Sequence, residues 1–150
     1  MTNRTAVEDL SPAMDGKSVL IAGWAQEVRD LKKIKFILLR DRSGIVQCIG
    51  LPNETEQKSF DEISNVTKES VVEVSGVVKK STQAKLGFEV VINKIKLFSR
   101  AEPLPIDISG KIETGLDNRL NFRFLDTRRP EINAIFRVRS EILAASVEFF

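Results

Sequence analysis

An aromatic ring lies within a cluster of charged side chains in segment 19–47, and this pairing is the chemistry-bearing feature of the chain. The segment that contains Phe36 has six basic residues and only three acidic ones, Glu27, Asp30 and Asp41. The whole chain is close to neutral, with a formal net charge of +2, so the basic excess is local. Cations attract phosphates and an exposed ring stacks on a base, which favours a surface for single-stranded nucleic acid. The basic residues are Arg29, Lys32, Lys33, Lys35, Arg40 and Arg42.

The composition gives little support for catalysis by this chain alone. Its 150 residues include no histidine, which removes Ser-His-Asp and Cys-His catalysis and histidine-ligated metals. Cys48 is the single cysteine, so an internal disulfide and a cysteine zinc cluster are excluded. Its place in a predicted strand is typical of a small buried core residue. No apolar run approaches the ~20 residues of a membrane span, and the first residues resemble no signal peptide, so we expect a cytoplasmic protein without a membrane partner.

Alternating polarity predicts an all-β domain with small helices. Phe60, Ile63 and Val66 recur at helical spacing after segment 53–56, which reads as a capping box with Asn53 as the N-cap. Three strands, a helix and two strands is the order of an OB-fold, a partly open five-stranded barrel. The predicted strands are 19–28, 34–40, 45–49, 70–80 and 88–98, and the predicted helix is 54–66.

An OB-fold binds its ligands on strands 2 and 3 and on the loops that join strands 1–2 and 4–5. In this chain those parts carry Phe36, Gln47 and the basic loops 30–33 and 79–87. Alternation alone fits Phe36 in the core as well as on the binding face. Gln47 is either a solvent-facing strand residue or a hydrogen-bonding group beside Phe36.

The chain after the barrel changes character at two closely spaced prolines. The run RAEPLP at 100–105 interrupts both helix and strand, so we expect a linker there. Pro130 suits the first position of a C-terminal α-helix. That helix ends on two phenylalanines without a cap, and we infer that it packs against protein beyond residue 150. We therefore divide the chain into a lead-in (1–16), an OB domain (17–99), a linker (100–116) and the truncated start of a further domain (117–150).

Four segments resemble the N-terminal third of aspartyl-tRNA synthetases of the archaeal and eukaryotic type. The first segment is also similar to lysyl and asparaginyl relatives, whereas the run from Arg123 to Glu131 favours the aspartyl family. The resemblance extends from about Gly16 to Phe150 and implies an anticodon-binding OB domain, a hinge and the first helix of a class II catalytic domain. The segments are AGWAQEVRDLKKIKFILLRDRSGIVQ, AKLGFEV, AEPLPID and DNRLNFRFLDTRRPEINAIFRVRSEI.

The resemblance also implies roles for single residues. In the family an arginine after strand 1, a phenylalanine on strand 2 and a glutamine on strand 3 bind the middle uridine of the anticodon, and these match Arg29, Phe36 and Gln47. A strand 5 glutamate, here Glu89, is associated with a neighbouring anticodon base. Positive charge, and not the resemblance, predicts the contacts to the tRNA backbone, which are Lys32, Lys33, Lys35, Arg42, Lys79 and Lys80.

Gln26 and Lys85 occupy the positions that the family uses at the third anticodon base. Members specific for the aspartate tRNA typically have Trp and Lys there, and members that also charge the asparagine tRNA tend to have His and Pro. This chain has a mixed pair, which leaves both the aspartate tRNA and the asparagine tRNA as partners.

The class II elements that bind ATP and aspartate lie beyond residue 150 in the family. We therefore expect no catalytic residue, metal or cofactor in this chain, with ATP and Mg needed only by a full-length enzyme, which in the family is a homodimer. The alternatives are a free-standing OB module that binds single strands with little sequence preference, and the same region of an asparaginyl- or lysyl-tRNA synthetase.

Overall fold

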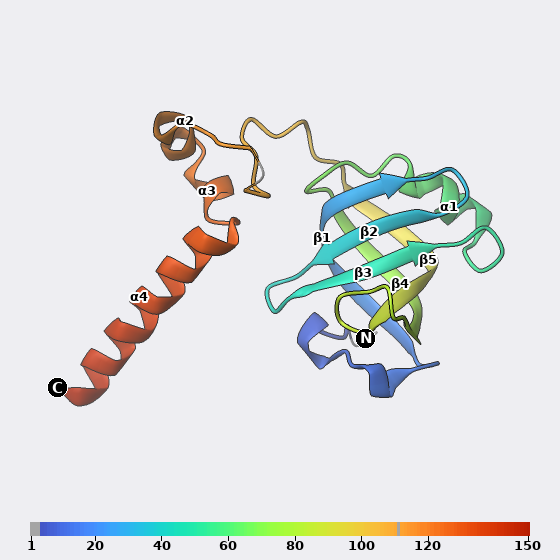
Figure 1. The fold of residues 1–150 in the computed structure, drawn as a ribbon, viewed down its shortest axis with the longest axis horizontal. Helices are drawn as coiled ribbons and strands as arrows, with labels where there is room; N and C mark the ends of the chain where they lie inside the picture. The colour runs from blue at the N-terminus through green and yellow to red at the C-terminus, as the bar shows by residue number, and fades with distance from the viewer. Residues whose placement is uncertain (1–3, 111) are drawn as a thin grey trace. The chain divides into compact units, whose positions relative to one another are not determined.

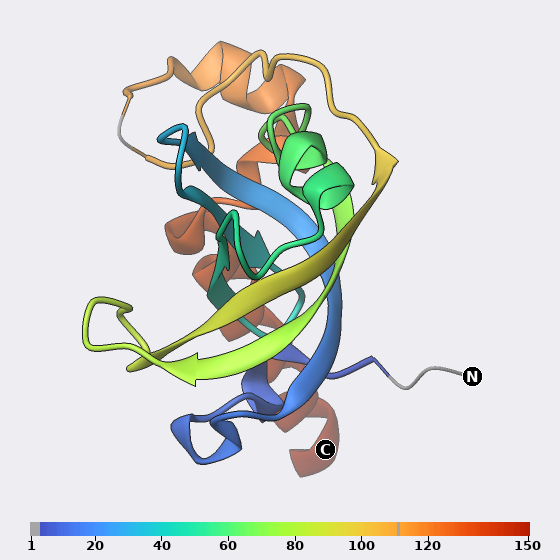
Figure 2. The ribbon, with the colours of Figure 1, turned by 90° about the vertical axis from the view of Figure 1, so that its right-hand side faces the viewer.

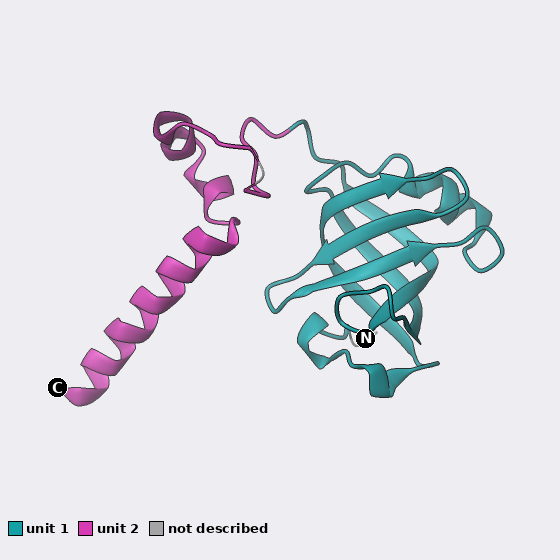
Figure 3. Cartoon of the chain, in the orientation of Figure 1, with its two compact units in different colours: residues 1–103 teal, residues 104–150 magenta. Residues whose placement is uncertain are grey.

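The chain divides into two units at Pro103 and Leu104, within the segment in which the prolines predict a linker. The computed structural model describes residues 4–110 and 112–150. Figure 3 colours the two units, Met1–Pro103 and Leu104–Phe150, which are described separately below.

The first unit is a closed five-stranded barrel, so the predicted OB-fold is confirmed (Figure 1). The strand order around the barrel is β1-β2-β3-β5-β4. The β3–β5 pair is parallel and the other neighbouring pairs are antiparallel. Each strand end lies within two residues of its predicted position. The strands are β1 (Ser18–Asp30), β2 (Lys35–Arg40), β3 (Ile45–Gly50), β4 (Val71–Lys80) and β5 (Phe88–Ser99).

Two glycines allow the barrel to close. A Cβ atom at Gly23 would lie 2.2 Å from the Arg40 carbonyl oxygen, and one at Gly76 would lie 2.3 Å from the Val91 carbonyl oxygen. The β1–β2 register shifts between Ala25 and Glu27, close to Gly23, and this shift marks a β-bulge. Figure 2 shows β1, β4 and β5 as long curved strands, with the β4–β5 loop extending beyond the barrel.

One helix, α1 (Gln57–Ile63), covers an end of the barrel and buries Phe60 and Ile63. It is shorter than the predicted 54–66, and the predicted capping box is wrong, because the N-cap residue is Glu56 and it makes no side-chain cap hydrogen bond. The Thr55 hydroxyl instead accepts a hydrogen bond from the Leu51 N–H (3.0 Å) and donates one to the Ile92 carbonyl (2.6 Å). Tertiary contacts with β5 thus override the local capping signal.

The N-terminal segment packs on the barrel and forms two single turns of 3-10 helix, η1 (Val7–Asp9) and η2 (Pro12–Met14). Val7 and Leu10 belong to the hydrophobic core. The Val7 N–H donates a hydrogen bond to the Asp41 carboxylate (2.8 Å), which ties this segment to the β2–β3 turn.

The second unit contains three helices, α2 (Leu116–Asn121), α3 (Arg123–Asp126) and α4 (Pro130–Phe149). Part of the expected linker is packed here, because Ile106 and Ile108 form a small buried cluster with Leu125. Helix α4 begins at Pro130, as predicted, and none of its residues is buried. Within residues 4–110 and 112–150, no helix has both the length and the apolar character needed to cross a membrane.

Candidate nucleic-acid interface

A hollow of about 240 Å³ opens on the outer surface of β1, β2 and β3, beside the β4–β5 loop. The strand register explains why its residues meet. Arg29 lies opposite Phe36 across β1 and β2, and Leu38 lies opposite Gln47 across β2 and β3. The lining consists of Glu27, Arg29, Leu31, Phe36, Leu38, Gln47 and Gln83.

The ring of Phe36 faces this hollow and not the core. Its neighbours Ile37 and Leu39 are fully buried, whereas Phe36 and Leu38 are half-buried on the opposite face of β2. Leu31, with 64% of its surface exposed, extends the apolar part of the lining. An exposed ring beside aliphatic side chains forms a surface on which a base can stack.

Gln47 is held by Glu89. The side-chain N–H of Gln47 donates a hydrogen bond to the Glu89 carboxylate (2.7 Å). The parallel pairing of β3 with β5, at Cys48 and Val90, brings the two residues side by side. An ionised carboxylate only accepts hydrogen bonds, so this contact orients the Gln47 amide and leaves its carbonyl oxygen available to a ligand.

Arg29 stands at the rim of the hollow with 61% of its side chain exposed, and its guanidinium pairs with the Glu27 carboxylate at 2.7 Å. Exposed ion pairs contribute only ~0–1 kcal/mol, so this pair orients the guanidinium without preventing it from turning to a ligand.

The expected backbone-contact residues fall into two groups. Five of them are exposed, and one of these, Lys79, forms an ion pair with Glu54 at 2.6 Å. The exposed residues are Lys32, Lys33, Arg42, Lys79 and Lys80. Lys35 does not belong with them, because only 5% of its surface is exposed and its amine donates to the Phe60 carbonyl at 2.7 Å. The prediction that Lys35 contacts the tRNA backbone is therefore corrected.

Arg40, part of the basic cluster noted in the sequence, is also directed inward. Its guanidinium pairs with the buried carboxylate of Glu69 at 2.7 Å and lies 5.8 Å from the centre of the Trp24 ring. The positive charge left for a ligand therefore comes from Arg29 at the rim of the hollow, from the β1–β2 and β2–β3 loops, and from the end of β4.

Gln26 and Lys85 do not line the hollow. Gln26 is the extra residue of the β1 bulge, and its buried side-chain oxygen has no hydrogen-bond partner among the described residues. Lys85 is exposed on the β4–β5 loop. Any contact that they make with an RNA lies beside the stacking surface.

Four lining residues were missed in the sequence. Glu27 and Leu38 share a strand face with Arg29 and Phe36, so alternation was the signal that identifies them. Leu31 and Gln83 were not singled out, but they lie in the loops 30–33 and 79–87, which the OB-fold order places at the binding surface, and the closed barrel brings both loops to this hollow.

Cys48 is buried in the core, as predicted. Burial, together with the negative charge of Glu89, raises the pKa of its thiol, which therefore stays protonated and unreactive. In the described part of the chain, His, Cys, Asp and Glu side chains form no group of three or more that could hold a metal ion.

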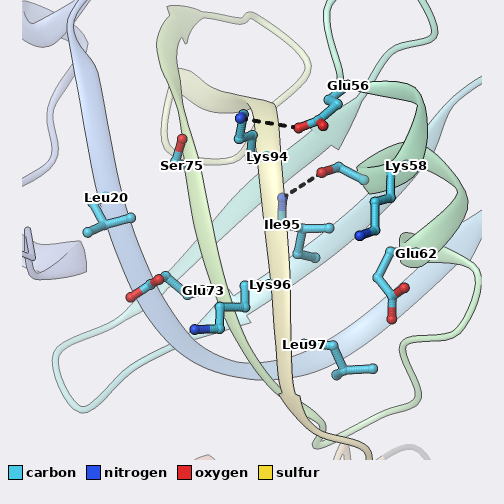
Figure 4. Close-up of a pocket in the computed structure, with 11 residues that line it drawn as sticks. Leu20, Glu56, Lys58, Glu62, Glu73, Ser75, Lys94, Ile95, Lys96 and Leu97 are labelled. Atoms are coloured by element: carbon cyan, nitrogen blue, oxygen red, sulfur yellow. Dashed lines mark hydrogen bonds and ion pairs between the residues drawn. The ribbon is translucent and has the colours of Figure 1, made fainter.

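A second hollow, of about 550 Å³, lies between α1 and the outer surface of β1, β4 and β5 (Figure 4). Its charged lining balances three lysines against three glutamates, and Lys94 and Glu56 pair at 3.5 Å. Its lining contains no aromatic ring. A surface without net charge or a ring is poorly suited to a nucleic acid, so the smaller hollow is the candidate interface.

The barrel defines a protein of the OB-fold class, and its hollow lies on the surface of β2 and β3, where OB-folds bind their ligands. Residues 19–98 match the family described as OB-fold nucleic acid binding domain, of the tRNA anticodon type. The chain belongs to this family.

Its relatives confirm the resemblance to aspartyl-tRNA synthetases. The chain is 46% identical to the aspartate–tRNA(Asp) ligase of Pyrococcus horikoshii over 95% of its length, and 44% identical to the aspartate–tRNA(Asp/Asn) ligase of Methanopyrus kandleri over 94%. It spans about a third of each of these relatives (33%).

Solved structures of aspartyl- and asparaginyl-tRNA synthetases contain a region with the same fold as this chain. The asparaginyl-tRNA synthetase of Pyrococcus horikoshii, in complex with asparaginyl-adenylate, superposes with a TM-score of 0.90 at 29% identity, over 99% of this chain and 34% of that one. The aspartyl-tRNA synthetase of Entamoeba histolytica gives 0.89 at 28% identity, over 99% and 37%.

Proposed function

We propose that this chain binds the anticodon loop of a tRNA as the OB domain of an aspartate–tRNA ligase, which attaches aspartate to tRNA with ATP and Mg. The observation that carries the proposal is the hollow in which the Phe36 ring, the Arg29 guanidinium and the oriented Gln47 amide meet. RNA recognition in single-stranded loops combines stacking on aromatic rings with hydrogen bonds to base edges, and this hollow offers both.

Phe36 stacks on the middle base of the anticodon in this proposal, and Gln47 reads the base edge. Because Glu89 holds the amide N–H of Gln47, the Gln47 carbonyl oxygen is presented to the base as an acceptor. Uracil has an N–H donor at position 3, and cytosine has an acceptor there. The proposed geometry therefore accepts uridine and rejects cytidine, while Arg29 donates to a carbonyl oxygen of the uracil.

The exposed cations Lys32, Lys33, Arg42, Lys79 and Lys80 surround this site as sequence-independent contacts to phosphates. Glu89 acts by orienting Gln47, and Gln26 and Lys85 are proposed to lie near the third anticodon base. Since the relatives include both aspartate–tRNA(Asp) and aspartate–tRNA(Asp/Asn) ligases at similar identity, the aspartate tRNA is the proposed partner and the asparagine tRNA a second one.

The parent ligase is proposed to act in the cytoplasm as a homodimer. An asparaginyl-tRNA synthetase has less support, because its identity with the chain is 29% compared with 46% for an aspartate–tRNA ligase.

The test is a titration of this chain with anticodon stem-loops that read GUC, GUU and GCC, at low and moderate salt. Tighter binding of GUC and GUU than of GCC is expected, and the GUC/GUU ratio then measures the discrimination achieved around Gln26 and Lys85. Equal binding of all three, governed only by salt, would mean a generic single-strand binder.

A further inference from the structure

Lys35 precedes Phe36 in β2 and points to the opposite side of the strand, into the end of the barrel that α1 covers. Its amine donates hydrogen bonds to the Phe60 carbonyl (2.7 Å) and the Ser64 hydroxyl (2.5 Å). It also lies 4.2 Å from the centre of the Phe60 ring. These partners belong to the C-terminal part of α1, where unpaired carbonyls and the helix dipole favour a cation. The buried Lys35 amine is thus held by hydrogen bonds to the C-terminal part of α1.

The contacts of Lys35 continue to the β1–β2 loop through Asp30. The Ser64 hydroxyl donates to one oxygen of the Asp30 carboxylate at 2.7 Å, and that oxygen is 3.5 Å from the Lys35 amine. The other oxygen accepts the backbone N–H of Lys32 at 2.8 Å. Lys32 has a φ of 68°, a left-handed conformation that side chains other than glycine seldom adopt, so the loop needs this support.

Asp30 is charged at neutral pH. The hydrogen bond from Ser64 lowers the pKa of the Asp30 carboxyl, and the Lys32 N–H and the Lys35 amine lower it further. The network therefore joins a cation, a hydroxyl and a carboxylate between α1 and the loop.

Two residues of this network are next neighbours in the chain of residues that line the candidate interface. Asp30 is flanked in the chain by Arg29 and Leu31, which both line the hollow, and Lys35 is adjacent to Phe36. Anchoring Asp30 and Lys35 to one point on α1 fixes the spacing between the rim of the hollow and its aromatic ring.

We propose that Lys35 is a positioning residue for base recognition, which acts through Ser64 and Asp30 to hold the β1–β2 loop so that Arg29 and Leu31 face Phe36. The inference rests on the proposed function, since it assigns Lys35 a part in recognising the middle base without touching the RNA. An ordinary lysine contact with phosphate adds affinity for every sequence equally, whereas a positioning residue changes the preference between sequences.

The experiment compares Lys35→Met with Lys33→Met, which removes an exposed lysine of the same loop. Affinities for GUC and GCC stem-loops are measured over a range of salt concentrations, and melting curves show that each variant folds. For Lys35→Met we expect the GUC preference to fall roughly two- to thirtyfold, the range for residues that couple to a site without contacting its ligand. The slope of log affinity against log salt should stay at the wild-type value.

Two results would overturn the proposal. A loss of about 0.7 in that slope with an unchanged GUC preference would make Lys35 a phosphate contact. An unchanged preference and an unchanged slope would make it a purely structural residue. The Lys33→Met variant shows how large a slope change one loop lysine produces under the same conditions.

Ser64→Ala covers the case in which Lys35→Met fails to fold, because it breaks the same network at an exposed side chain. Faster hydrogen exchange of the Lys32 amide and a reduced GUC preference are expected, and wild-type values of both would count against the proposal. A wild-type chain that binds GUC and GCC equally would instead refute the proposed function, while amide exchange would still report whether the network holds the loop.

Discussion

Replacing Phe36 with alanine tests the stacking surface most directly. The ring is half-buried in the hollow, opposite Arg29 on β1, and Ile37 and Leu39 supply the core side of the same strand. Loss of base–ring stacking costs ~1–3 kcal/mol. Since about 1.4 kcal/mol corresponds to a factor of ten, affinity for a GUC stem-loop should fall roughly 5- to 150-fold.

The salt dependence of binding should be unchanged in Phe36→Ala, because the substitution removes no charge. The barrel should lose less stability than the ~3–5 kcal/mol typical of a buried phenylalanine, since this ring lies outside the core. Stem-loop titrations at several salt concentrations and thermal melts measure the two effects separately.

Phe98→Ala is the matched control. Phe98 is also a barrel phenylalanine, with 46% of its surface exposed, and it does not line the hollow. Its ring lies 4.8 Å from the Lys96 amine, so its loss disturbs a surface contact of another part of the barrel. Equal losses of affinity in Phe36→Ala and Phe98→Ala, or wild-type affinity in Phe36→Ala, would refute the stacking argument.

Three further substitutions test how the barrel supports the site. Gly76→Ala should lower stability to urea by ~1–3 kcal/mol, because the new Cβ would lie 2.3 Å from a carbonyl oxygen of β5; an unchanged midpoint would contradict the close approach. Arg40→Met should cost about 3 kcal/mol in the same assay, because it removes the ion-pair partner of the buried Glu69 carboxylate. Burial raises the pKa of Asp41, but hydrogen bonds from backbone N–H groups and a serine hydroxyl outweigh this, and the folded-state pKa is lowered. The stability that this carboxylate contributes is present above its ordinary pKa of about 3.9 and is lost as the pH falls through the folded-state value. The melting temperature should therefore drop less in Asp41→Asn than in the wild type between pH 5.5 and pH 3, and equal drops would rule out this role.

The strands were predictable because alternation follows from the covalent geometry of an extended chain. The same rule assigns Phe36 and Leu38 to one face of β2, although it does not say which face is the core. It also places Lys35 on the face of Ile37 and Leu39, yet charge alone led to its prediction as a tRNA contact. Only the position of α1 at the end of the barrel shows what a buried lysine amine binds there.

The prediction of an N-cap at Asn53 was wrong for a related reason. The signal at Asn53 is local, whereas the contact that the structure makes instead joins Thr55 to Ile92 on β5. A local preference of ~1 kcal/mol is no larger than the net contribution of one buried hydrogen bond, so it does not decide the structure when contacts between distant segments favour another arrangement.

The sequence by itself determined the five strands, the basic loops, the aromatic residue on β2 and the absence of histidine chemistry, since each depends on residue type and near-neighbour spacing. The tertiary structure decided which strands become neighbours, and with that the site. The parallel pairing of β3 with β5 brings Gln47 to Glu89, and closure brings Gln83 to the hollow with Phe36. These contacts join residues far apart in the chain, and barrel closure, which no local pattern encodes, is what sets them.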